Sequence, residues 1–433
     1  MNRRAALSFA LLLVLGVLAV AGCGDDNGTE PQPDTWYGGI EIASPVDTLR
    51  VGERVTFTAA VTDTNGQPVM TPALTWSSSD PAVAEVDAGG RVTGRGEGTT
   101  VILATGGHVV SDPETLVVVQ GYGWVDQSGG ALTTNALNGV HFFDRQRGWA
   151  VGDLGTVLAT GDGGLTWERQ SSQSTNYALN GVFFTTADRG FVVGSAGRIL
   201  ETGNGGGTWT ARLGIDTDAQ PLHDVHFFGP DLGFIVGGQG VLLRTDDGGD
   251  TWRRVTSRVT AYPLYAIWAT AAPGPDTLVW AVGGNGTIIG SRDAGRSWYI
   301  YTPSITAWEL RGVARLSLTR AQAVGAQNTV GVTEASGDTA RWVLAVPPGD
   351  FTNFRDVSWP ATGRAYAVGA NLTGRANVLL STDGGLVWTT QQLPGTAPLE
   401  NHALRSVWFV DETHGWAVGE GGLILHTATG GTP

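Results

Sequence analysis

Cysteine is almost absent from this sequence. Cys23 is the only one among 433 residues, so no disulfide can form within the chain. Charged residues are also scarce, at 15%, and 40 acidic against 26 basic residues give a formal net charge of −14. A chain this acidic has no broad basic face for nucleic acid, so we predict no nucleic-acid partner. The acidity favours solubility and a monomer.

Long apolar runs are equally few. The single one covers residues 5–21 and follows Arg3 and Arg4. A charged start followed by an apolar run is typical of an export signal. No second run is long enough to span a membrane. The export signal ends in VAGC at residues 20–23, which places small residues directly before the cysteine.

This ending resembles the lipobox of bacterial lipoproteins. The resemblance implies cleavage before Cys23 and transfer of a diacylglycerol to its thiol, so we predict a signal peptide over residues 1–22 and membrane attachment through lipid alone. The alternative is an uncleaved anchor with an unused thiol. Gly24 is not the aspartate associated with inner-membrane retention, which favours an exported protein held at the outer membrane or the cell surface.

Two regions follow the anchor. Residues 23–36 are polar, contain two prolines and show no periodicity, which predicts a flexible tether. Residues 37–120 alternate apolar and polar along short segments separated by turn signals, which predicts a β-sandwich. The segment 74–104 resembles the bacterial immunoglobulin-like domains of group 2, through WSSS at 76–79 and GRV at 90–92. The resemblance implies a spacer or an adhesive module, so a stalk and a ligand-binding unit both remain open.

Residues 121–433 repeat one strand that ends in Val-Gly. The seven copies are GWAVG at 148–152, GFVVG at 190–194, GFIVG at 233–237, VWAVG at 279–283, AQAVG at 321–325, AYAVG at 365–369 and GWAVG at 415–419. Their closing glycines lie 42 to 50 residues apart, a period typical of propeller blades of four strands each. We therefore predict an all-β chain, with an immunoglobulin-like sandwich followed by a seven-bladed β-propeller.

Five repeats share the turn Ser/Thr-x-Asp-x-Gly-x-x-Trp, the Asp-box. Its Asp or Asn and its Trp are Asp162 and Trp167, Asn204 and Trp209, Asp247 and Trp252, Asp293 and Trp298, and Asp383 and Trp388. A short carboxylate can accept hydrogen bonds from its own turn while the tryptophan packs beneath. The acids around Asp247 also suggest calcium, but they lack the alternating spacing of a known calcium loop. We predict structural turns and no metal.

The seventh repeat stops without a tryptophan or a fourth strand. Trp124 stands 13 residues before Leu137, close to the spacing from a blade tryptophan to the next blade elsewhere. We predict that residues 121–127 supply the missing strand, because this removes an open sheet edge and joins the two ends of the propeller.

The repeat pattern VxF…GWxVGxxGxxLxTxDGGxTW resembles the propellers of photosystem II assembly and stability factors, and more distantly those of BNR-repeat proteins, sialidases and sortilins. The resemblance covers about 300 residues. It implies a non-catalytic assembly factor that holds a partner polypeptide or a cofactor-bearing intermediate. The lipobox and the immunoglobulin-like unit are additions to that pattern.

One position varies among the repeats, the residue after the opening Leu or Phe of each blade. It is occupied in order by Asn138, Asn180, His223, Tyr265, Arg311, Arg355 and Arg405. Equivalent positions lie at equal height on a ring, so the three arginines should gather in one sector at the channel mouth. Guanidinium groups suit carboxylates, and we expect an anionic peptide or glycan as ligand. The candidate binding residues are Arg311, Arg355, Arg405, Tyr265 and His223. The alternative is that each arginine pairs with a nearby acid, as Arg355 could with Asp356 and Arg311 with Glu309.

The rival function is a glycoside hydrolase of sialidase or xyloglucanase type. Sialidases use arginines and a tyrosine with a glutamate partner, but no Arg-Ile-Pro segment opens this ring and no glutamate recurs near Tyr265 in the repeat frame. His223 and His226 are three apart on a strand, so we expect them on opposite faces and unable to share a metal. We predict no catalytic residue and no cofactor, and a cell-envelope lipoprotein that binds a protein or glycan in adhesion, as a scaffold or in complex assembly.

Overall fold

The computed structural model describes residues 37–431, except for residues 71, 120–122, 129–131, 174–175, 256–258, 271–276, 303, 316–320, 335–340, 346–352, 362, 395–398 and 400. The predicted signal peptide, the predicted lipidation site Cys23 and the predicted tether lie outside the described residues. The chain divides into two compact units. In the described part, no helix has the length and apolar character needed to span a membrane.

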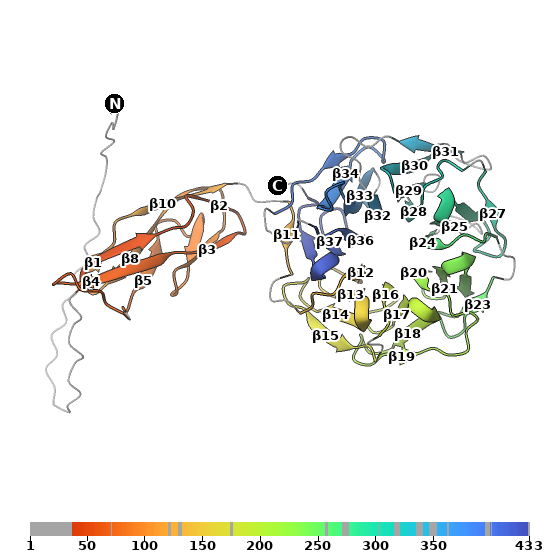
Figure 1. Cartoon of the computed structure of the whole chain (residues 1–433), viewed down its shortest axis with the longest axis horizontal. Coiled ribbons are helices and arrows are strands. Elements are labelled where there is room, and N and C mark those ends of the chain that lie inside the picture. Colours follow the sequence, from red (N-terminus) through yellow and green to blue (C-terminus); the bar gives the residue numbers. More distant parts are fainter. Residues whose placement is uncertain are drawn as a thin grey trace. The chain divides into compact units, whose positions relative to one another are not determined.

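Residues 37–119 form short strands in three sheets (Figure 1). The strands are β1 (Tyr37–Ala43), β2 (Thr48–Arg50), β3 (Arg54–Thr56), β4 (Thr58–Asp63), β5 (Thr75–Ser78), β6 (Ala84–Val86), β7 (Arg91–Gly94), β8 (Gly98–Gly106), β9 (Val109–Val110) and β10 (Glu114–Val119). The sheet orders are β1-β4, β2-β10-β8-β5 with β9 beside β8, and β3-β7-β6.

Alternation along β8 decides which of its faces is buried. Thr100, Ile102 and Ala104 are buried, and the residues between them are partly exposed. In β10, Leu116 and Val118 are buried in the same way. Because side chains of a strand point alternately to its two faces, this sheet presents one apolar face to the core, where Ala104 packs with Ile40, Ile42 and Val61 of the β1-β4 sheet. The β-sandwich predicted from this alternation is confirmed.

The second unit is a ring of seven four-stranded antiparallel sheets among the described residues (Figure 1). Six sheets are consecutive in the chain: β12 (Leu137–Phe142), β13 (Gly148–Gly152), β14 (Thr156–Thr160) and β15 (Glu168–Ser171); β16 (Leu179–Phe184), β17 (Gly190–Gly194), β18 (Arg198–Thr202) and β19 (Thr210–Ala211); β20 (Leu222–Phe228), β21 (Leu232–Gly237), β22 (Leu242–Thr245) and β23 (Arg253–Arg254); β24 (Leu264–Thr270), β25 (Leu278–Gly283), β26 (Ile288–Ser291) and β27 (Tyr299–Ile300); β28 (Leu310–Arg315), β29 (Ala321–Gly325), β30 (Thr329–Glu334) and β31 (Arg341–Ala345); β32 (Asn353–Ala361), β33 (Arg364–Ala370), β34 (Ala376–Ser381) and β35 (Thr389–Thr390). The seventh contains β36 (Leu404–Phe409), β37 (Gly415–Gly419), β38 (Ile424–Thr427) and β11 (Val125–Asp126).

Short 3₁₀ turns join the second and third strands of five sheets. They are η1 (Asp153–Gly155), η2 (Ser195–Gly197), η3 (Gly238–Gly240), η4 (Gly284–Gly286) and η6 (Glu420–Gly422). The all-β propeller architecture predicted from the repeats is confirmed. We call β12, β16, β20, β24, β28, β32 and β36 the inner strands; each contacts the next, and β36 contacts β12.

Aromatic side chains join neighbouring sheets. Trp149 of β13 stacks on Phe184 of β16 with ring centroids 3.4 Å apart, and Trp416 of β37 stacks on Phe142 of β12 at 3.5 Å. All four rings are buried. A lone sheet of four short strands could not cover both of its apolar faces, so each sheet is stabilised by the sheets on either side.

The ring closes by hydrogen bonds between its two ends. Strand β11 pairs with β38, and Val125 lies opposite His426. Trp124 is fully buried and meets Phe409 edge to face, with centroids 5.8 Å apart. The prediction that the segment around Trp124 completes the last sheet is confirmed.

The five Asp-box turns share one set of hydrogen bonds. In the first, the Thr160 hydroxyl donates to Asp162 Oδ1 at 2.8 Å, and the Thr166 amide donates to the same oxygen at 2.9 Å. Asn204 accepts from the Thr208 amide at 2.9 Å in the second turn. The oxygen of a neutral side-chain amide therefore accepts the same hydrogen bond as the carboxylate, which favours a structural turn over a cation site.

Trp124→Ala should open the ring at its closure. Removing a fully buried tryptophan typically costs about 3–5 kcal/mol, and the free energy of unfolding should fall by that order. Urea unfolding followed by circular dichroism measures it. Trp308→Ala is the matched control, because Trp308 is 55% exposed and its loss should change stability by less than about 1 kcal/mol. Equal losses in the two variants would contradict closure through Trp124.

Candidate functional site

Every inner strand begins with a β-bulge. In β12 the pairing with β13 passes from Leu137 directly to Gly139, which leaves Asn138 out of register. The same shift occurs at the same place in the other six inner strands. A bulge inserts an unpaired residue and redirects the side chains around it. The variable residues identified in the sequence are these seven bulged residues.

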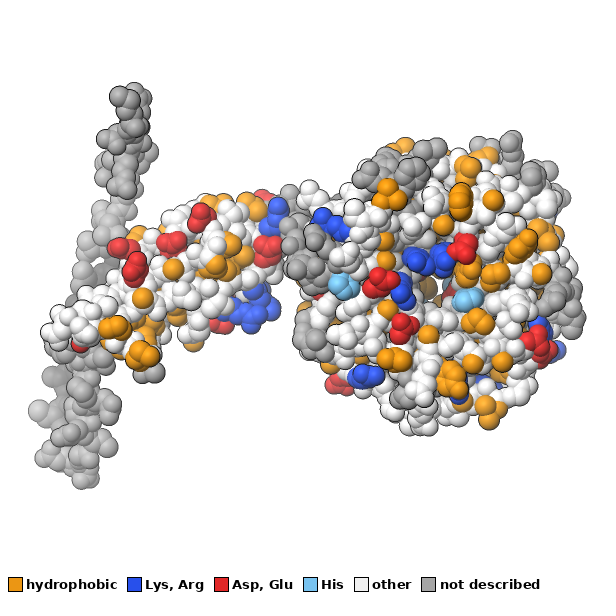
Figure 2. All heavy atoms as spheres, in the orientation of Figure 1, with side chains coloured by type: hydrophobic (Ala, Val, Ile, Leu, Met, Phe, Trp, Pro, Cys, Tyr) orange, Lys and Arg blue, Asp and Glu red, His pale blue; other side chains and the backbone are white. Residues whose placement is uncertain are grey.

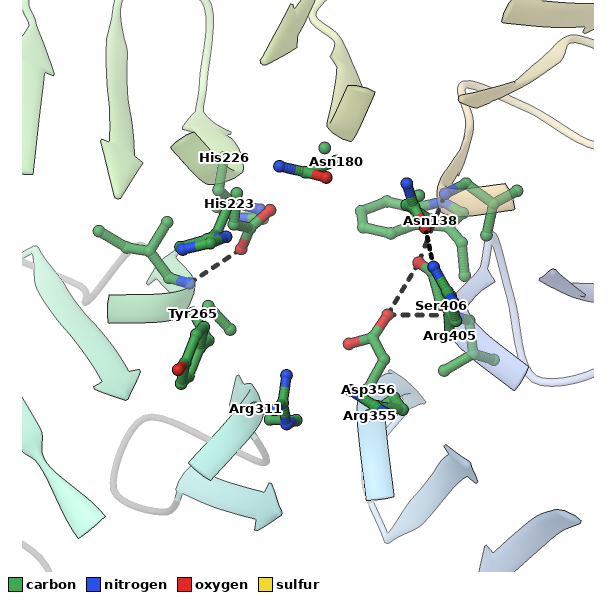
Figure 3. Close-up of a pocket in the computed structure, with 18 of the residues that line it drawn as sticks. Asn138, Asn180, His223, His226, Tyr265, Arg311, Arg355, Asp356, Arg405 and Ser406 are labelled. Carbon is green, nitrogen blue, oxygen red and sulfur yellow. Dashed lines mark hydrogen bonds between the residues drawn. The ribbon is translucent and has the colours of Figure 1, made fainter. Parts of the chain in front are cut away.

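The bulged residues line one cavity at the centre of the ring (Figure 3). The cavity, called the cup below, encloses about 730 Å³ including the space open to solvent. Its rim residues are Asn138, Asn180, His223, Tyr265, Arg311, Arg355 and Arg405. All five candidate binding residues therefore lie on one cavity. Figure 2 shows arginine side chains gathered at the centre of the ring beside acidic ones.

Two of the three rim arginines have acidic partners. Arg311 pairs with Glu309, as the sequence suggested. Arg405 donates to Glu420 at 2.9 Å and to Asn138 Oδ1 at 2.6 Å. Glu420 was missed by the sequence analysis, although Asp153 occupies the equivalent place in the first sheet.

Arg355 differs from its neighbours. The suggested pair with Asp356 is wrong, because Asp356 Oδ2 accepts instead from the Ser406 hydroxyl and the Val407 amide, both at 2.9 Å. Within the described part of the chain, Arg355 makes no hydrogen bond or ion pair. Its side chain is half-buried, and burial together with the charges of Arg311 and Arg405 lowers its pKa. The cup therefore holds one guanidinium with no directly bonded acid among the described residues, and Glu309 and Glu420 offset the lowering of its pKa only in part.

A glutamate does lie beside Tyr265, contrary to the sequence analysis. The Tyr265 hydroxyl donates to Glu309 Oε1 at 3.3 Å, and the Arg311 guanidinium lies 4.9 Å from the centre of the Tyr265 ring. Glu309 comes from the start of the next sheet rather than from the sheet of Tyr265, so comparison of residues within one repeat could not find it. Burial, and then Glu309, raise the pKa of Tyr265.

Two aspartates lie below the rim. Asp224 accepts from the amides of Val225 and Ile267 at 2.8 and 2.9 Å. Asp356 has the same place in β32 and accepts from the amides of Val357 and Val407 at 2.8 and 2.9 Å. Burial raises the pKa of Asp224 to about 6 and that of Asp356 to about 7, the latter also because Asp224 is near. The repeat did not predict either acid, because only two of the seven inner strands carry an aspartate at this place.

Aromatic rings bridge the channel beneath the aspartates. Trp408 lies 4.4 Å from His141, 6.0 Å from Phe183 and 6.2 Å from Trp268, measured between ring centroids. His226 joins Phe183 and Trp268 at 5.0 and 4.4 Å. Phe183, His226, Trp268 and Trp408 form the floor of the cup, and His141 packs against Phe183 and Trp408. Burial lowers the pKa of His141 to about 3 and that of His226 to about 4, so both are neutral near pH 7.

The expectation that His223 and His226 face opposite ways is wrong. Both line the cup, His223 at the rim and His226 at the floor. The bulge at His223 breaks the alternation of the strand, which the sequence did not signal. Among the described residues, no three His, Cys, Asp or Glu side chains form a group that could hold a metal ion.

Asp356→Asn should change how stability depends on pH. Between about pH 4 and pH 7 the folded chain keeps a proton on Asp356 that the unfolded chain releases, so the free energy of unfolding should fall as pH rises. Removing this group should reduce the decrease in the free energy of unfolding across this pH range by at most about 4 kcal/mol. Urea unfolding at several pH values in this window tests it, with the exposed Asp216→Asn as control. An unchanged pH slope in Asp356→Asn would contradict the raised pKa.

Two family models match parts of the chain. Residues 169–264 match the photosynthesis system II assembly factor YCF48, and residues 71–108 match the intimin immunoglobulin-like domain. No curated protein sequence matches the chain.

Several solved structures share the propeller fold. The structure "YCF48 bound to D1 peptide" is 21% identical with a TM-score of 0.56, covering 71% of this chain and 97% of its own. YCF48 from Cyanidioschyzon merolae is 20% identical with a TM-score of 0.55, covering 70% and 98%. The GH74 enzyme of Niastella koreensis is 15% identical with a TM-score of 0.53, covering 67% of this chain and 52% of its own. The chain therefore joins an immunoglobulin-like unit to a propeller similar to YCF48, in a fold shared by enzymes and non-enzymes.

Proposed function

We propose that this chain is an exported lipoprotein, anchored through Cys23, whose propeller binds a partner polypeptide by a carboxylate at the rim of the cup. Arg355 carries the proposal. An unpaired, half-buried guanidinium loses hydration without gaining a partner, so a ligand carboxylate that supplies the partner is favoured there. The planar fork of arginine suits a carboxylate better than a single-point cation would.

The paired arginines strengthen this site without competing for the ligand. Glu309 and Glu420 neutralise Arg311 and Arg405, so the sector around Arg355 keeps a local positive charge of about one. The pairs also hold the flanking side chains in place. A single carboxylate therefore matches the site better than a highly charged polyanion.

The similar structures favour a polypeptide as the partner. One of them is named for YCF48 with a bound D1 peptide, and the YCF48 family model matches part of this propeller. A non-catalytic role in complex assembly, in adhesion or as a scaffold at the cell envelope fits a lipid anchor and an immunoglobulin-like spacer.

Glycoside hydrolysis is the second candidate, and one observation favours it. Tyr265, Glu309 and three arginines occur together at the rim, as a sialidase mechanism requires. Two features weigh against it: the pKa of Tyr265 is raised, which keeps the phenol protonated, and Glu309 is already paired with Arg311. Binding is therefore the better supported function.

Arg355→Ala should weaken binding of carboxylate ligands. The test is binding of the full-length protein in detergent to an array of peptides, each present with a free C-terminal carboxylate and as the amide, and of sialylated and neutral glycans. Peptides selected by the wild type should weaken by at least about tenfold in the variant, because a charge-assisted pair is worth about 1.5–3 kcal/mol. Arg253→Ala, at a side chain that is 73% exposed, should leave binding unchanged.

Two results would overturn the binding proposal. Equal affinity of Arg355→Ala and wild type for every ligand would mean that the rim does not hold the carboxylate. Release of sialic acid by the wild type, lost in Tyr265→Phe, would establish the hydrolase instead.

Cys23→Ser should release the protein from the membrane. In a bacterial host fed labelled palmitate, the wild type should carry label and sediment with membranes, while the variant should do neither, because the serine hydroxyl does not replace the lipidated thiol. An unlabelled wild type that still sediments would indicate an uncleaved anchor.

A further inference from the structure

The cup is layered by charge. Arg355 is the unpaired cation at the rim, Asp224 and Asp356 come one position after the rim residues of their strands, and the aromatic floor comes two positions further along. On an inner strand the floor residue comes three positions after the rim residue, a distance of about 10 Å at about 3.3 Å per residue. A ligand that enters past the rim therefore meets carboxylates and then ring faces.

The two carboxylates face each other across the channel. Asp224 lies on the third inner strand and Asp356 on the sixth, so they come from nearly opposite sides of a ring of seven. They are close enough for the charge of Asp224 to raise the pKa of Asp356. Both remain partly exposed to the cup.

Ring closure does not require these acids. The equivalent residue in the other five inner strands is Gly139, Gly181, Ala266, Gly312 and Ser406. In the first sheet a hydroxyl takes the place of the carboxylate: the Val140 amide donates to the Ser406 hydroxyl at 3.4 Å. Two partly buried carboxylates, whose pKa values desolvation raises, thus cost energy that five of the seven sheets avoid.

The carboxylates also have acceptor capacity left. An ionised carboxylate offers about four acceptor positions. The hydrogen bonds described above use two at Asp224 and three at Asp356. Neither acid forms an ion pair with a described residue. The chain contains no lysine, so a lysine ammonium in the cup must come from a ligand.

The floor suits a cation as well. Phe183, Trp268 and Trp408 line the cup and are partly exposed, and indole faces attract ammonium groups. His141 and His226 are neutral near pH 7 and add no repulsion. Carboxylates beside aromatic faces are a combination that recognises cations, whereas an apolar ligand end would leave both acids unpaired.

We propose that the cup binds the C-terminal lysine of its partner polypeptide, with the α-carboxylate at Arg355 and the ε-ammonium between Asp224 and Asp356 above the aromatic floor. This inference rests on the proposed carboxylate site and names the group that enters beyond it. The four-carbon stem of lysine carries the ammonium past the rim while the carboxylate stays there. A free lysine has the same two charges, but its α-ammonium would lie among the rim arginines, which favours the peptide.

The test compares four peptides on the full-length protein in detergent by calorimetry and tryptophan fluorescence. They are acetyl-glycyl-glycyl-lysine, its C-terminal amide, its ε-acetyl derivative and the norleucine analogue, which keeps the stem without the charge. The lysine peptide should bind at least about tenfold more tightly than each of the others and than free lysine. It should also change the fluorescence, because Trp268 and Trp408 line the cup.

The outcomes separate this inference from the proposed function. If norleucine equals lysine while the amide binds weakly, the ammonium site is wrong and the carboxylate site stands. If the amide equals the acid, the carboxylate site itself is wrong. Tighter binding of free lysine than of the peptide would overturn the assignment to a polypeptide end.

The double variant Asp224→Asn/Asp356→Asn localises the ammonium. It should reduce the preference for the lysine peptide over the norleucine peptide by about tenfold, whereas Asp216→Asn, at a side chain that is 67% exposed, should not alter this preference. An equal effect on both peptides would contradict the ammonium site. The peptide series in the wild type decides the question even if the double variant fails to fold, because it needs no substitution.

Discussion

The free inner edge of each sheet is the constraint on which the rest of the propeller depends. Every four-stranded sheet turns one edge toward the channel, where its N–H and C=O groups have no strand to pair with. Side chains of the preceding sheet meet part of that need. Asn180 donates to the carbonyl of Leu222 at 2.7 Å, and Asp224 accepts from the amide of Ile267 at 2.9 Å. The contacts that hold the ring together therefore also place polar groups in its centre.

The β-bulges place the variable residues at the rim of the cup. The residue before each bulge, such as Leu137 or Leu310, is fully buried and packs the sheet, so the bulged residue itself carries no packing duty. It can change from asparagine to arginine without disturbing the core. Core packing and the variable side chain thus lie on adjacent residues of the same strand, which allows the rim to vary while the core stays packed.

Charge inside the cup is set by a balance between burial and pairing. Arg311 and Arg405 form ion pairs with Glu309 and Glu420, whereas Arg355 is half-buried and has no bonded partner among the described residues. The aspartates below respond to burial by holding protons to higher pH. A site with an uncompensated cation above and under-neutralised acids below is electrostatically incomplete by itself. It favours a ligand that brings both signs of charge in the opposite order.

The sequence by itself determined the sandwich, the propeller repeat, the closure through Trp124 and the ring position that varies, because each is a matter of periodicity or spacing along the chain. The contacts between charged groups emerged from the folded ring alone. Glu309 reaches Tyr265 from the next sheet, Asp356 faces Asp224 across the channel, and the bulge brings His223 and His226 to one cavity. A repeat pattern reports where a residue lies within its own sheet. Contacts across a ring join residues of different sheets, and no local pattern records which of them will be neighbours.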